Sequence, residues 1–155
     1  MKKIIQILLF LMMIACMCGI FIFSSQTSEQ SNKLSNTVTQ KIAESASISE
    51  TTDTSINSHF HILIRKYAHF SIFFLLGLPA AAFSILTYNK LGIKLLFPTM
   101  LCLLWAVSDE IHQLYIPGRS CNLKDVLIDF SGSMLAIVCI FGIWIAYKKI
   151  RSRKI

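Results

Sequence analysis

Ionisable and hydrogen-bonding side chains gather in one stretch of this 155-residue chain, residues 108–129, which lies between two long apolar runs. A second polar group, Arg65, Lys66 and His69, stands at the start of another apolar run. Histidine and carboxylate side chains together can carry out general acid–base chemistry, and arginine can bind phosphate or carboxylate through charge-assisted hydrogen bonds. The candidate catalytic residues are therefore His69, Glu110, His112, Asp125 and Asp129, and the candidate residues for binding an anionic substrate are Arg65, Lys66, Gln113 and Arg119.

Helical spacing brings these side chains onto shared faces, because residues four positions apart lie on the same side of an α-helix. Three pairs have this spacing: Arg65 and His69, Asp109 and Gln113, and Asp125 and Asp129. If all three helices carry their pairs at the same membrane depth, the polar faces point at one pocket. We therefore predict a shared site, which suits an amphiphilic ligand such as a lipid-linked phosphate.

The sequence predicts no metal site and identifies no cofactor. His69, His112, Glu110, Asp125 and Asp129 are residue types that ligate divalent ions, but no HExxH-like spacing is present. The 5 cysteines lack the paired spacing of a zinc site or a disulfide framework. Four of them lie inside apolar runs, where we interpret them as small apolar residues, and the fifth lies in the polar stretch.

A purely structural interpretation of the polar residues stays open. Arg119 could pair with Asp125 or Glu110, and Arg65 with Asp109. These ion pairs would balance one another's charges and hold the helices together without binding any ligand. A purely structural ion-pair network does not require two histidines, a glutamine and four carboxylates in one place. Ionisable groups within a membrane protein typically mark function, which favours a site.

Composition indicates a membrane protein. Hydrophobic residues make up 54% of the chain and charged residues 15%, and the mean hydropathy is +0.61, which is more apolar than a typical soluble domain. The formal net charge is +7. Because the basic residues cluster beside apolar runs, this charge indicates contact with membrane lipids rather than with nucleic acid.

Four apolar runs are long enough to be transmembrane helices, and we expect an all-α integral membrane bundle. The runs cover residues 1–23, 67–88, 95–115 and 125–147. The purely apolar part of the third run ends at Val107, too early to cross a bilayer of about 30 Å at about 1.5 Å per residue. This helix must therefore continue past Glu110 to about Tyr115, which brings its polar end toward the membrane.

We divide the chain into three regions. They are the first transmembrane helix at residues 1–23, an external loop rich in Ser and Thr at residues 24–58, and a core at residues 59–155 with three transmembrane helices and a basic cytoplasmic tail. In the loop, Leu34, Val38 and Ile42 recur every fourth residue, a weak sign of an amphipathic helix. A solvated linker explains the same composition equally well.

Small residues predict where the transmembrane helices approach one another closely. Gly77 and Ala81, and likewise Gly132 and Ala136, are four residues apart, a spacing that lets two helix backbones come together. Pro79 lies between the first two and predicts a kink in that helix.

The distribution of charge predicts the orientation in the plasma membrane. In a four-helix arrangement one side carries the basic residues of both termini and of the short turn at residues 89–94, and it carries no acidic residue. The other side carries every Asp and Glu of the chain. By the positive-inside rule both termini are cytoplasmic, and both polar groups face outward.

The segment RKYAHFSIFFLLG, followed after one further span by SDEIHQLYIPGRSCNLKDVLIDFSG, resembles the VanZ-like membrane protein family, and FSSQ after the first helix agrees with it. The resemblance covers residues 21–144. It implies a small multi-helix membrane bundle associated with low-level resistance to teicoplanin, a glycopeptide antibiotic, and it implies no established reaction. The positions that match the family pattern are Arg65, Lys66, His69, Glu110, Gln113, Arg119, Asp125, Asp129 and Gly132.

From the residues and the resemblance together we expect a multi-pass plasma-membrane protein that acts at the outer face on the cell envelope. Whether it is an enzyme stays open. One alternative is an enzyme acting on a lipid-linked or anionic headgroup by His/carboxylate acid–base chemistry. The other is a non-catalytic scaffold for envelope proteins. The expected partners are membrane lipids and a lipid-linked envelope precursor.

Overall fold

A computed structural model describes residues 1–27, 37, 54–119 and 121–153, with the backbone alone for residues 54–62. Its helices are α1 (Lys2–Ser24), α3 (Thr54–Thr87), α4 (Leu91–Gln113) and α5 (Leu123–Ser152). Each of these four helices is long and apolar enough to cross a membrane. The described part of the chain contains no strand, so the predicted all-α bundle of four transmembrane helices is confirmed.

Three helices extend beyond their predicted ends. The backbone of α3 is already helical at Thr54, inside the predicted external loop, because no Gly or Pro interrupts the sequence between Thr54 and Leu76. In the same way α5 continues through the basic residues after Tyr147 to Ser152. The turn before α4 is shorter than predicted, since the helix begins at Leu91. Low hydropathy marks the edge of the bilayer and not the end of a helix.

The helix proposed around Leu34, Val38 and Ile42 lies outside the described residues.

The third predicted span continues through its polar residues as predicted, because α4 includes Asp109 and ends at Gln113. Pro79 lies inside α3, which continues beyond it to Thr87.

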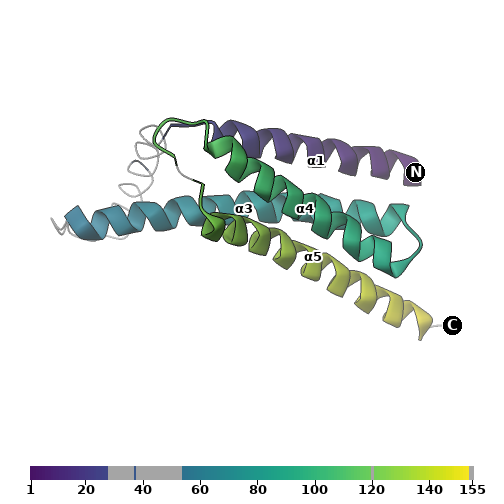
Figure 1. The fold of residues 1–155 in the computed structure, drawn as a ribbon. Coiled ribbons are helices and arrows are strands. Elements are labelled where there is room, and N and C mark those ends of the chain that lie inside the picture. Colours follow the sequence, from purple (N-terminus) through teal and green to yellow (C-terminus); the bar gives the residue numbers. More distant parts are fainter. Residues whose placement is uncertain (28–36, 38–53, 120, 154–155) are drawn as a thin grey trace.

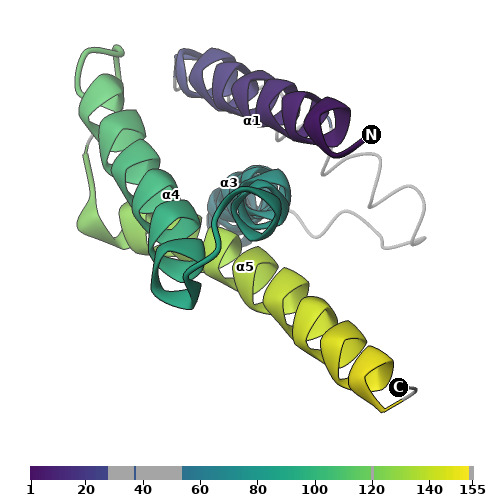
Figure 2. The same ribbon diagram turned by 90° about the vertical axis from the view of Figure 1, so that its right-hand side faces the viewer.

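Helix α3 is the centre of the bundle. Viewed along its axis, it is surrounded by α1, α4 and α5 (Figure 2), and it contacts all three of them. Helix α4 also contacts α1 and α5. The N-terminus, the turn between α3 and α4 and the C-terminus lie together at one end of the bundle (Figure 1). The end of α1 and the connection between α4 and α5 lie at the opposite end, so the four helices alternate in direction as the sequence predicted.

The predicted small residues allow the close contact between α3 and α5. A Cβ added at Gly77 would stand 2.8 Å from Cβ of Ala136 and 2.7 Å from the backbone oxygen of Ser133. A Cβ added at Gly132 would collide with the backbone oxygen of Phe70. Ser133 is buried between the two helices, and its hydroxyl donates to the backbone oxygen of Phe73 at 3.2 Å. This contact sets how α3 and α5 are rotated about their axes, and therefore which side chains they turn toward each other.

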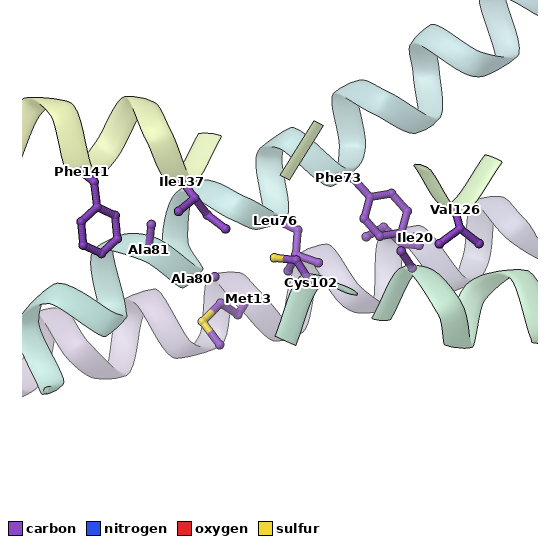
Figure 3. Close-up of a cluster of buried hydrophobic side chains, with 11 residues drawn as sticks. Met13, Ile20, Phe73, Leu76, Ala80, Ala81, Cys102, Val126, Ile137 and Phe141 are labelled. Atoms are coloured by element: carbon purple, nitrogen blue, oxygen red, sulfur yellow. The ribbon is translucent and has the colours of Figure 1, made fainter. Parts of the chain in front are cut away.

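The apolar core lies along α3 from Phe73 to Ala81 (Figure 3). Met13 and Ile20 reach it from α1, Cys102 from α4, and Ile137 from α5. At the other end of the bundle from the polar residues, Trp144 lies under two cations, with Lys94 at 4.5 Å and Lys148 at 5.1 Å from its ring. An amphipathic ring with basic neighbours is typical of the headgroup region of a membrane.

Candidate functional site

A pocket of about 150 Å³ opens between α3, the end of α4, the start of α5 and the connection between these last two helices. It lies at the end of the bundle where α1 ends. All but one of the candidate catalytic and substrate-binding residues line it, namely Arg65, Lys66, His69, Glu110, Gln113, Arg119, Asp125 and Asp129. Gly118 and Ile128 complete the lining. The two polar groups of the sequence therefore meet at one pocket.

The connection between α4 and α5 is shaped by Gly118 and Asn122. Gly118 has φ 75°, a left-handed conformation that favours glycine, and it turns the chain back toward α5. The side chain of Asn122 caps α5 by accepting a hydrogen bond from the backbone N–H of Lys124 at 3.1 Å. The backbone N–H of Asn122 donates to Glu110 Oε2 at 2.9 Å. Glu110 thus ties the last turn of α4 to the first turn of α5.

Asp109 is buried at the junction of α4 and α1. Its Oδ2 accepts hydrogen bonds from the hydroxyl of Ser24 at 2.7 Å and from Gln113 Nε2 at 2.9 Å. Ser24 is the last residue of α1 and is fully buried. Sequence reasoning placed Asp109 on the polar face of its helix but did not identify Ser24. The only signal was the FSSQ segment, whose serine and glutamine residues turn out to contact the site.

Two contacts between a basic and an acidic side chain join α3 to α5 across the pocket. Lys66 Nζ lies 3.7 Å from Asp125 Oδ1, with both side chains partly exposed. Deeper in the bundle, His69 Nδ1 lies 3.5 Å from Asp129 Oδ2. These pairs differ from the network considered from the sequence, in which Arg65 and Arg119 were the cations. Among the described residues neither arginine has a carboxylate within ion-pair distance.

Arg119 is held in place by a backbone contact and forms no ion pair among the described residues. Its Nε donates to the backbone oxygen of Gln26 at 3.0 Å, and another guanidinium nitrogen is buried without a hydrogen-bond partner among the described residues. Burial lowers the pKa of Arg119 from its ordinary value, and the positive charge of Arg65 lowers this pKa further. The guanidinium remains protonated because arginine starts from a very high pKa. The pocket therefore holds two cations close to each other, neither of which forms an ion pair among the described residues.

Asp129 has the most unusual environment in the pocket. The residue is 0% exposed, and neither of its carboxylate oxygens has a hydrogen-bond partner among the described residues. Nearly all buried polar groups in proteins do have such partners. A carboxylate in this position is stable only if a cation compensates its charge or if it is protonated.

His112 lies outside the pocket. Its ring stacks on Phe21 of α1, with centroids 4.2 Å apart, and its Nε2 stands 3.1 Å from the hydroxyl of Ser25. Helix α4 thus turns His112 toward α1 and Gln113 toward the pocket, although the two residues are adjacent. The described contacts of His112 attach the end of α1 to the bundle.

The family model VanZ/LLP1 matches residues 9–146, which is most of the chain and includes both polar groups. A search of curated proteins found no match, and neither did a search of solved structures. The matched range covers the larger part of α1 and continues almost to the end of α5. The chain therefore belongs to the VanZ/LLP1 family, and with four helices able to cross a bilayer it is a multi-pass membrane protein.

Proposed function

We propose that this protein binds the anionic headgroup of a lipid-linked envelope precursor at the outer face of the plasma membrane, and that it thereby alters susceptibility to glycopeptides such as teicoplanin. The observation that carries the proposal is the pair of arginines, Arg65 and Arg119, which line the pocket and have no carboxylate within ion-pair distance in the described part of the chain. Arginine binds phosphate through two parallel hydrogen bonds. The buried unpartnered nitrogen of Arg119 is a donor of the kind that such an anion would satisfy.

The volume of the pocket supports a small anionic group as the part of the ligand that enters. Pockets for drug-sized molecules measure roughly 300–1,000 Å³, whereas this pocket measures about 150 Å³. A phosphate is small enough for such a space, while a sugar or peptide attached to it would remain outside. Because the pocket lies at the membrane-surface end of three spans, the lipid tail of the same molecule can remain in the bilayer.

A binding measurement on purified protein tests the proposal. Replacing Arg119 by Gln removes the positive charge of the side chain. We therefore expect the affinity for a polyprenyl phosphate in detergent to fall by about tenfold or more. This is the effect of losing one hydrogen bond to a charged group, which contributes about 1.5–3 kcal/mol. The matched control is Arg151→Gln, in the exposed end of α5 away from the pocket. Equal affinity of Arg119→Gln and wild type would contradict headgroup binding here. Cells that carry Arg119→Gln should also lose any effect of the protein on teicoplanin sensitivity.

An enzymatic version of this function has one observation in its favour, the proximity of His69 to Asp129 beside the arginines. A histidine held by a carboxylate can act as a general base toward a bound headgroup. Replacing His69 by Gln distinguishes the two versions. In an enzyme this variant still binds the polyprenyl phosphate but no longer changes the precursor profile of the cell, whereas a binding protein without chemistry produces the same profile with either residue.

A further inference from the structure

We infer that His69, Asp109 and Asp129 form a binding site for a divalent transition-metal ion. The argument starts from Asp129, which is fully buried and has two carboxylate oxygens without hydrogen-bond partners among the described residues. Nδ1 of His69 stands 3.5 Å from Oδ2 of Asp129. This distance is longer than the 2.7–2.9 Å or so of a charge-assisted hydrogen bond. The carboxylate is thus placed to receive a cation that the side chains themselves do not supply.

The three residues offer donor atoms at a separation that a metal ion can bridge. One atom from each of His69, Asp109 and Asp129 can be chosen so that all lie within 4.8 Å of one another. Zinc binds imidazole nitrogen and carboxylate oxygen at about 2.0–2.2 Å, so ligands in a tetrahedral site stand about 3.3 Å apart. His69 and Asp129 are already near that separation, at 3.5 Å. The third donor atom lies within 4.8 Å of the other two, so it has to move by no more than about 1.5 Å to reach the separation of ligands in a tetrahedral site.

The surrounding protein orients two of the three ligands. Asp109 Oδ2 accepts from Ser24 and Gln113, and such hydrogen bonds to a carboxylate ligand typically fix its orientation and tune its affinity. The position of Asp129 is determined by the close contact of α3 with α5 at Gly132. The ligands come from three different helices, and the packing of these helices brings the three residues near one another.

The site also has an open side. His69 and Asp129 line the pocket, whereas Asp109 lies behind them toward α1. Three protein ligands with one position open to a pocket is the arrangement of metal sites that bind or activate a ligand. Two carboxylates would balance the charge of a divalent ion, and the open position would face the same space as Arg65 and Arg119. An anionic oxygen entering the pocket would meet the metal ion and both arginines.

The sequence does not predict this site, because a sequence pattern reveals metal ligands only when they have a local spacing. Here each ligand comes from a separate helix, so no motif of the HExxH kind can be present. Metal binding does not require the headgroup of the proposed function, and it goes beyond that function. The two proposals can therefore fail separately.

Metal binding is tested on the full-length protein in detergent, first treated with a chelator and then equilibrated with Mn²⁺ or with Zn²⁺. Mn²⁺ is the more selective probe, because carboxylate ligands suit it and the thiols of the 5 cysteines favour softer ions. We expect one bound ion per chain, measured by elemental analysis after gel filtration. Asp129→Asn and His69→Gln should each reduce the affinity for Mn²⁺ by about tenfold or more.

Asp125→Asn is the matched control, since it removes the same charge from the same pocket without touching the three ligands. It should bind Mn²⁺ like the wild type. Arg119→Gln should also keep the metal while losing the headgroup, which separates this inference from the proposed function.

Thermal unfolding shows whether a variant that no longer binds metal is still folded. Without metal, Asp129→Asn should unfold at the same temperature as the wild type or higher, because it removes an uncompensated buried charge. Added Mn²⁺ should raise the unfolding temperature of the wild type and leave that of Asp129→Asn unchanged. A wild-type protein that binds neither ion, or an Asp129→Asn variant that binds Mn²⁺ as tightly as the wild type, would overturn the inference.

Discussion

At the scale of single residues, the polar end of the bundle combines satisfied and unsatisfied groups. Asp109 has two donors, Ser24 and Gln113, whereas Asp129 has no hydrogen-bond partner among the described residues. Both are carboxylates buried at the same end of the bundle. The contrast distinguishes their surroundings, since Asp109 also stabilises the attachment of α1, whereas both oxygens of Asp129 remain available to a cation.

The attachment of α1 through Asp109 can be measured. Ser24→Ala removes one of the two donors to a buried carboxylate, which should lower the free energy of unfolding by about 1–3 kcal/mol. The control is Ser131→Ala, because Ser131 is exposed and, among the described residues, its hydroxyl bonds within its own helix to the backbone oxygen of Ile128. Reversible unfolding in mixed detergent measures both variants. Equal stabilities would show that the bond between Ser24 and Asp109 adds nothing.

At the scale of the helices, close packing of α3 on α5 decides which polar residues meet. The sequence predicted the small residues Gly77 and Gly132, and the structure places each against the backbone or a small side chain of the partner helix. That contact turns His69 toward Asp129 and Lys66 toward Asp125. Helical spacing alone shows which residues share a face, but the rotation of one helix against another depends on the packing of all the side chains between them.

Glycine variants test this packing directly. Gly132→Ala places a Cβ against the backbone oxygen of Phe70, which cannot move without shifting α3, so the variant should be destabilised by about 1–3 kcal/mol. Gly142→Ala lies in the same helix with nothing within 4 Å of its added Cβ, and it should not lose stability. Unfolding of the two variants under identical conditions provides the measurement. If Gly132→Ala is as stable as Gly142→Ala, the helices are not held at this contact.

At the scale of the whole molecule, the sequence predicted most of the fold and the composition of the site. The length of the third apolar run required α4 to include Asp109, and the alternation of four spans placed Arg65 at the same end. What could not be predicted was the pairing. The sequence offered Arg119 as a partner of Asp125 or Glu110 and Arg65 as a partner of Asp109. In the structure Lys66 lies beside Asp125, and His69 lies beside Asp129. His112 was likewise a candidate by residue type, and only the structure turns it toward α1.

The orientation of the molecule in the membrane remains a prediction from charge, and Cys121 offers a test. It is exposed and lies in the connection between α4 and α5, beside the pocket, while Cys16, Cys18, Cys102 and Cys139 lie within helices that can span the membrane. If the pocket faces outward, a membrane-impermeant maleimide added to intact cells should label Cys121. The same reagent should not label the Cys121→Ser variant to the same extent.

The pH dependence of the labelling reaction follows from the surroundings of the Cys121 thiol. Desolvation and the negative charge of Glu110 raise the pKa of Cys121 above its ordinary value, so the reactive thiolate becomes more abundant only as the pH rises. Labelling should therefore be faster at pH 8.5 than at pH 7. A second variant, Ser152→Cys in the Cys121→Ser background, reports the opposite end of the bundle and should react only after the cells are permeabilised. Labelling of Ser152→Cys but not of Cys121 in intact cells would reverse the orientation and place the pocket in the cytoplasm, where it could not act on the outer face.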